Sequence, residues 1–173
     1  MTSTIERIAP FKNEIVKNFQ DPADAAAMKA ALDEVRAAFG KHYPLVIDGR
    51  KIETEKKIRS LNPADPEQVV GLTSSASKAQ ANEAVEAAAR AFESWKRLTL
   101  PERAEYLLRA AALLKQRRFA YDALLVYEVG KSWPEADGDI AEAIDFLEFY
   151  AREALRYAEP HPVVPIDGER NEM

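Results

Sequence analysis

Cysteine is absent from this chain of 173 residues, and histidine occurs only as His42 and His161. Without cysteine the chain can form no disulfide, no thiolate metal site and no cysteine nucleophile of its own. The two histidines lie far apart in the sequence, each beside a turn-like segment, so they give poor support for a metal site or a catalytic triad. We therefore expect two ordinary histidines at the surface or at its boundary.

Glycine-rich loops and long apolar runs are also missing. The six glycines are isolated from one another, which excludes a glycine-rich phosphate-binding loop. There is no nucleophile-elbow serine and no HExxH metal motif. No apolar run approaches membrane-spanning length, and the polar N-terminus differs from a signal peptide. These absences predict a cytoplasmic protein, or one with an organelle signal that the pattern does not reveal, with no metal site and no membrane partner.

The composition that remains is that of a soluble globular protein, with 47% apolar and 31% charged residues. The net charge of −5 argues against a general affinity for nucleic acid. Lys115, Arg117 and Arg118 form a basic cluster at the end of a predicted helix. We expect these side chains to complement the helix dipole and to face water.

Start and stop signals delimit a series of helices. An Asp-Pro pair begins a helix over Pro22–Phe39, and Gly40 ends it. Capping boxes at Ser77–Gln80 and Thr99–Glu102 begin two further helices, which a short connection should make antiparallel. A fourth helix is predicted over Phe119–Val129, again with a glycine as its stop.

Short strands are predicted between the first two helices. The turn dipeptide Asp48-Gly49 separates a strand at 43–47 from a partner at 51–53. Another strand, at 69–72, follows a loop that composition predicts at Asn62–Pro66. Strands this short are not stable alone, so they must pack on the helices or join a sheet.

The segment Glu135–Tyr157 predicts a helix with two apolar faces. Phe146 and Phe149 lie together on one face, with Glu142 one turn before Phe146. A surface helix of a small domain needs only one apolar stripe, so more protein, a ligand or both must cover the second face. The opposite face is a continuous stripe at helical spacing, made by Ile140, Ala143, Ile144, Leu147, Ala151, Ala154 and Leu155.

The acidic residues of this helix have different expected roles. Burying Glu142 among aromatic rings is costly unless a cation pairs with it, so the residues alone favour an ion pair with an internal Arg or Lys. Together with Glu142, the other acidic residues recur at every third position and so spread around the helix, which predicts a solvated face rather than a metal cage: Asp139, Asp145 and Glu148. Gly138 costs ~1 kcal/mol relative to Ala in a helix, so we expect it to serve close packing or a bend.

Several stretches, taken in order, resemble the aldehyde dehydrogenase superfamily: SLNPADPEQVVG, AFESWKRLTLPERAEYLLRAAALL and YEVGKSWPEADGDIAEAIDFLEFYA. The subgroup of L-glutamate γ-semialdehyde (1-pyrroline-5-carboxylate) dehydrogenases is similar even in PFKNEIVKNFQ and FGKHYPLVIDGR. The resemblance implies an α/β fold, in which this segment is mostly α-helical with a short β-hairpin and forms the outer part of a Rossmann-type cofactor-binding domain. It divides the chain into an N-terminal arm and helix, residues 1–40, and an incomplete cofactor-binding domain, residues 41–173.

Members of this family are much longer, and their catalytic residues lie beyond the equivalent of Met173. The resemblance therefore implies the N-terminal part of an NAD-dependent enzyme that oxidises L-glutamate γ-semialdehyde, formed from 1-pyrroline-5-carboxylate, to L-glutamate in proline catabolism. The segment alone is expected to be inactive, with NAD bound mainly by residues outside it, and the full-length protein is expected to be a homo-oligomer.

Glu142 is the one site residue that the resemblance carries over, as a contact for the α-ammonium group of the substrate. No catalytic, cofactor-binding or metal-binding residue is carried over. The alternative hypothesis is a non-catalytic helical interaction module, derived from the family, that docks through its uncovered face.

Overall fold

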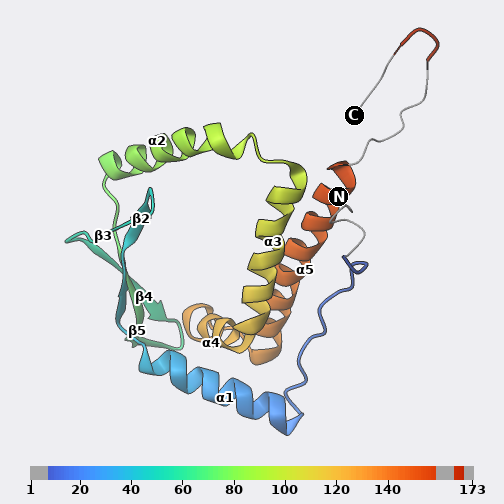
Figure 1. Cartoon of the computed structure of the whole chain (residues 1–173). Coiled ribbons are helices and arrows are strands. Elements are labelled where there is room, and N and C mark those ends of the chain that lie inside the picture. The colour runs from blue at the N-terminus through green and yellow to red at the C-terminus, as the bar shows by residue number, and fades with distance from the viewer. Residues whose placement is uncertain (1–7, 159–165, 170–173) are drawn as a thin grey trace. The chain divides into compact units, whose positions relative to one another are not determined.

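The structure is a computed structural model of the whole chain, and it describes residues 8–158 and 166–169. Helices and strands alternate in blocks, with one helix before the strands and the others after them (Figure 1). Their bounds are α1 Pro22–Ala37, β1 Lys41–Tyr43, β2 Leu45–Ile47, β3 Arg50–Ile52, β4 Lys57–Asn62, β5 Asp65–Ser74, α2 Lys78–Trp95, α3 Leu100–Gln116, α4 Arg118–Val129 and α5 Trp133–Ala158. None of the helices in the described part of the chain combines the length and apolar character needed to cross a membrane.

The chain divides into two compact units. Unit 1 comprises the N-terminal residues up to Glu14, Leu98–Gln116 and the residues from Ala141 onward. Unit 2 comprises Ile15–Arg97 and Arg117–Ile140, so helix α5 contributes to both units. The predicted division into residues 1–40 and 41–173 concerns domains of a complete protein and stays a prediction.

The strands of unit 2 form two small sheets. In the first, β5 lies between β1, which runs parallel to it, and β4, which runs antiparallel. The second is the hairpin β2–β3, whose turn residues Asp48 and Gly49 have φ angles of 53° and 73°. Positive φ at both central residues is the type I′ geometry that favours hairpins, which confirms the predicted turn. The predicted loop at Asn62–Pro66 is shorter than expected, because β4 and β5 stay paired up to Asn62 and Asp65.

The core of unit 2 lies between α1 and α4. Met28 and Ala31 of α1 pack against Ala123 of α4, and partly buried aromatic residues close the cluster: Phe19, Phe119 and Trp133. Asp21 caps α1 as predicted, since its Oδ1 accepts from the backbone N–H of Ala23 at 2.8 Å. Small alanines on both helices allow their backbones to approach closely.

The core of unit 1 lies between α3 and the later part of α5. Ala104 of α3 packs against Ala151 and Leu155 of α5, which confirms the predicted apolar stripe. The capping box at the start of α3 is also confirmed: the Thr99 N–H donates to Glu102 Oε2 at 2.7 Å, and the Glu102 N–H donates back to Thr99 Oγ1 at 3.4 Å.

The expectation that Gly138 serves close packing needs correction, and the expected pairing of two helices stays a prediction. A Cβ atom at Gly138 would meet no atom within 4 Å, so close packing does not explain this glycine. The predicted antiparallel pairing of α2 with α3 stays a prediction, because the two helices belong to different units. Within α2 only Ala87 is buried, while the apolar side chains of Val85 and Phe92 are exposed.

Candidate functional site

The predicted aromatic face of α5 lies in unit 1 and is open to solvent. Phe146 and Phe149 are 52% and 41% exposed. Tyr150, which the sequence analysis missed, stacks on Phe146 with ring centroids 6.0 Å apart, and Phe11 meets Phe149 edge-on at 5.5 Å. The spacing of four residues between Phe146 and Tyr150 was the available signal for this pair.

Glu142 is exposed on the same helix. Within residues 8–158 and 166–169 it makes no hydrogen bond or ion pair, so the internal ion pair that we favoured from the residues alone is wrong. A carboxylate in water needs no protein partner. Its charge is therefore available to a cation that approaches this face.

The N-terminal arm is fastened to α5 within unit 1. Asp145 accepts hydrogen bonds from Asn13 Nδ2 at 2.8 Å and from the backbone N–H of Glu14 at 2.7 Å. Arg152 Nε donates to the carbonyl of Ala9 at 3.0 Å. Asp145 thus holds the arm through hydrogen bonds and is not part of a solvated face. The arm therefore lies beside the aromatic residues of α5.

Ion pairs extend this attachment to α3. Lys115 Nζ lies 3.0 Å from Glu14 and 3.3 Å from Glu148, and the hydrogen bond to Glu14 is the main cause of its raised pKa. Partial burial would raise the pKa of Glu148, but hydrogen bonds from Arg152 and Lys115 outweigh it and lower that pKa. Lys115 and Arg152, two cations that contact this part of the chain, are therefore already paired with carboxylates.

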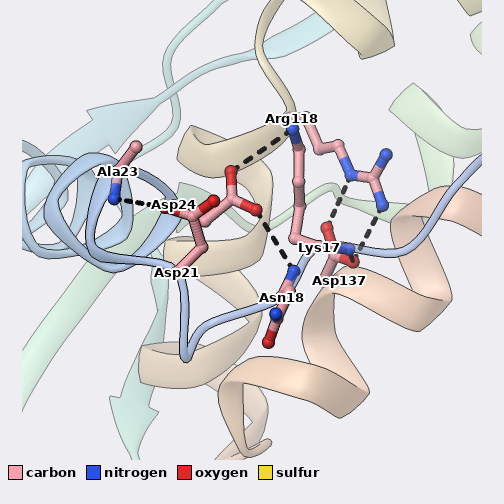
Figure 2. Close-up of polar contacts among 7 residues, drawn as sticks. All are labelled: Lys17, Asn18, Asp21, Ala23, Asp24, Arg118 and Asp137. Carbon is pink, nitrogen blue, oxygen red and sulfur yellow. Dashed lines mark hydrogen bonds and ion pairs between the residues drawn. The ribbon is translucent and has the colours of Figure 1, made fainter.

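A second group of charged residues lies in unit 2, where Arg118 and Asp137 are buried. Figure 2 shows the contact between these two side chains. Arg118 Nε and Nη2 donate to the two oxygens of Asp137 at 2.6 and 2.8 Å, and the backbone N–H of Lys17 donates to Asp137 Oδ2 at 2.7 Å. Arg118 is only 5% exposed, so the expectation that it faces water is wrong. The sequence did contain a signal for a buried charge: Asp137 lies on an apolar stripe, at helical spacing before Ile140 and Ile144.

Asp122 belongs to the same group and has no partner. It lies one turn after Arg118 on α4, it is 0% exposed, and neither carboxyl oxygen has a hydrogen-bond partner among the described residues. Burial, followed by the negative charge of Asp137, raises the pKa of Asp122 to about 7, against the opposing effects of Arg118 and Lys17. The carboxyl group is therefore largely protonated just below neutral pH.

Within the described residues, His42 forms no catalytic site. His42 Nε2 lies 2.8 Å from Lys57 Nζ and 2.9 Å from Ser74 Oγ, and its Nδ1 lies 3.6 Å from Glu53. A ring nitrogen that accepts from Lys57 is not available to take a proton from the buried Ser74. His161 lies outside the described residues. In the part of the chain that the structure describes, no group of His, Cys, Asp or Glu side chains is placed to hold a metal ion.

Comparison with known proteins adds a family relationship to this geometry. The model described as the aldehyde dehydrogenase family matches residues 50–173. The chain is 51% identical over 163 residues to 1-pyrroline-5-carboxylate dehydrogenase 2 of Bacillus subtilis (strain 168), a match that covers 94% of this chain and 32% of that protein. The chain thus spans about a third of the length of the curated relatives it matches.

Solved structures show the same relationship. The 1-pyrroline-5-carboxylate dehydrogenase from Thermus with bound NAD has a TM-score of 0.89 and 50% sequence identity, covering 96% of this chain and 32% of that one. The Delta-pyrroline-5-carboxylate dehydrogenase from Mycobacterium tuberculosis, bound with NAD and cobalamin, has a TM-score of 0.81 and 26% identity, covering 95% and 32%. These matches confirm the α/β fold that the resemblance implied.

Proposed function

The chain belongs to the aldehyde dehydrogenase family, and we propose that it acts as the N-terminal part of an NAD-dependent dehydrogenase that oxidises L-glutamate γ-semialdehyde to L-glutamate. The observation that carries this proposal is the high identity to 1-pyrroline-5-carboxylate dehydrogenases along nearly the whole chain. The segment has no cysteine to serve as a nucleophile, so we expect it to be inactive alone. The homo-oligomer expected of a complete protein stays a prediction.

The residues of this segment do not fit NAD on their own. A dinucleotide pyrophosphate is bound where a glycine-rich turn lets the backbone approach it at a helix N-terminus. The glycines of this chain are isolated, and helices α2 and α3 begin with capping boxes whose own side chains satisfy the first N–H groups. We therefore assign NAD binding to the part of the relatives' length that this chain does not span.

We assign Glu142 to the substrate. L-Glutamate γ-semialdehyde keeps an α-ammonium group, and a carboxylate binds such a cation with a charge-assisted hydrogen bond. Glu142 is exposed and has no partner among the described residues, while the rings of Phe146 and Tyr150 stand on the same helix. Aromatic faces also attract ammonium groups, so this surface suits the charged end of the substrate.

A chimera tests the proposal, with this chain replacing the matching third of the Bacillus subtilis relative. It should oxidise L-glutamate γ-semialdehyde with NAD, and Glu142→Gln should lower kcat/KM for that substrate about 10- to 100-fold, because a hydrogen bond to a charged group contributes about 1.5–3 kcal/mol. The value of kcat/KM for propanal, which lacks the ammonium group, should stay nearly unchanged.

The matched control for this experiment is Glu86→Gln, which removes an equal charge from an exposed glutamate of α2. It should leave both values of kcat/KM unchanged. Equal losses for the two aldehydes in Glu142→Gln would show that Glu142 is structural, and an inactive chimera would count against the function itself.

A second candidate function is supported by the exposed apolar side chains of α2 and α5, among them Val85, Phe92 and Phe146. Such surfaces are typical of interaction sites, so the chain could instead be a non-catalytic helical module that docks on another protein. The mass of the native protein decides between the two. A species with the mass of this chain alone favours the module, and a much longer species favours the dehydrogenase.

A further inference from the structure

The segment Lys17–Asp24 belongs to unit 2, where its Phe19 packs edge-on against Trp133 and a small number of polar contacts add to this packing. The backbone N–H of Lys17 donates to Asp137, and the Lys17 ammonium lies 3.4 Å from Asp24 and 5.4 Å from the ring centre of Phe119. Asp24 also accepts from the backbone N–H of Asn18 at 3.1 Å, as Figure 2 shows. Asp137 is thus the residue through which the polar contacts of this segment reach helix α5, beside the packing of Phe19 on Trp133.

Asp137 has a second carboxyl group as its neighbour. Arg118 and Asp122 lie four residues apart on α4 and so share one face of that helix. Arg118 gives two of its N–H groups to Asp137, and Asp122 receives none of them. An ionised, fully buried Asp122 would then have neither a hydrogen bond nor a paired cation, which is a costly state.

A proton on Asp122 removes this conflict. A protonated carboxyl group can donate, and ionised Asp137 beside it can accept. The charged groups around Asp122 come from three elements: Arg118 on α4, Asp137 on α5 and Lys17 on the N-terminal segment. With Asp122 neutral, the Asp137 carboxylate is paired with Arg118, and the Lys17 ammonium is paired with Asp24.

We propose that Asp122 and Asp137 share one proton, and that this proton keeps the segment Lys17–Asp24 attached to helices α4 and α5. Loss of the proton places two buried negative charges beside one guanidinium, and the attachment weakens. The carboxyl pair thus makes the attachment of the segment Lys17–Asp24 dependent on pH.

The direction of the effect follows from proton linkage. The pKa of Asp122 is raised from 3.8 to about 7 in the folded chain, so the folded state binds the proton more tightly than an opened state. The stabilisation is complete below pH 3.8 and is lost as the pH rises through about 7. Between pH 6 and pH 8.5 the equilibrium constant for attachment should fall by about tenfold.

Two measurements on this 173-residue chain test the proposal. The carboxyl carbon of Asp122, followed by NMR, should titrate near neutral pH, and this measurement needs no variant. Amide hydrogen exchange at Lys17, corrected for its intrinsic pH dependence, should show about tenfold less protection at pH 8.5 than at pH 6. In Asp122→Asn, whose amide can donate as the protonated acid does, protection should not change with pH.

The matched control is Asp33→Asn, which removes an equal charge from an exposed position on α1 and should keep the pH dependence of the unmodified chain. The proposal is overturned if Asp122 titrates near the pKa of an ordinary aspartate. It is also overturned if Asp122→Asn and the unmodified chain lose protection at Lys17 equally between pH 6 and pH 8.5.

Discussion

Replacing Arg118 by methionine should strongly destabilise unit 2. Methionine keeps much of the length of the arginine stem but removes the guanidinium from Asp137, which is 0% exposed. Among the described residues, Asp137 would keep the hydrogen bond from the backbone N–H of Lys17, but no cation would pair with it directly. Removing one member of a buried ion pair typically costs about 3–5 kcal/mol, because the other charge stays buried without compensation. That loss is a large share of the 5–15 kcal/mol that stabilises a typical domain.

Urea unfolding followed by tryptophan fluorescence measures this loss, because both tryptophans, Trp95 and Trp133, belong to unit 2. Arg117→Met is the matched control. Arg117 precedes Arg118, is exposed and makes no side-chain cap, so its loss should stay within about 0.5 kcal/mol. A similar small loss in both variants would refute the assignment of Arg118 to a buried ion pair.

A double-mutant cycle separates the pair from its surroundings. Asp137→Asn alone should also be destabilising, because it removes the charge of the carboxylate that accepts two hydrogen bonds from the buried Arg118 guanidinium. The double variant should lose less than the sum of the single losses, with a coupling energy of about 0.5–3 kcal/mol. Strict additivity would mean that the two side chains do not interact in solution.

We expect replacement by alanine to have opposite effects on the free energy of unfolding at two glycines. Gly130→Ala should destabilise unit 2 by more than about 1 kcal/mol, because φ is +75° there and the added Cβ would come within 3.0 Å of Pro63 Cγ. Gly138→Ala should raise the free energy of unfolding by about 0.5–1 kcal/mol, since this helical position leaves open space for a methyl group. Urea midpoints at constant slope measure both, and a stabilising Gly130→Ala or a destabilising Gly138→Ala would contradict the geometry.

The parts of the fold that the sequence predicts well are those that local chemistry determines. Ser77 and Gln80 exchange side-chain and backbone hydrogen bonds across three residues, so the four-residue pattern contains all of the information needed. The hairpin turn at Asp48-Gly49 is local in the same sense, because the dipeptide itself tolerates positive φ. Neither feature depends on a distant segment.

Arg118 shows why other features could not be predicted. The basic cluster reads as the end of one helix, but α3 ends at Gln116 and α4 begins at Arg118. The side chain therefore lies in a first helical turn, and its partner Asp137 is 19 residues away on α5. A periodic pattern identifies the stripe on which Asp137 lies, but it does not identify which cation reaches that stripe.

The contacts of the carboxylates on α5 indicate what kind of partner can cover the exposed aromatic face of this helix. Asp137 is paired with Arg118 and Asp145 holds the N-terminal arm, whereas Glu142 has neither kind of contact within the described ranges. Water satisfies Glu142 while the face stays open, but the neighbouring Phe146 favours coverage, at roughly 25 cal/mol for each Å² of apolar surface removed from water. Any partner that covers this face also takes water from Glu142, and the carboxylate then needs a cation. The ammonium group of the aldehyde substrate and a basic side chain of the covering protein both meet that need. Measuring kcat/KM of Glu142→Gln with the two aldehydes separates these two possibilities. Only a contact with the ammonium group of the substrate makes the loss of kcat/KM depend on which aldehyde is used.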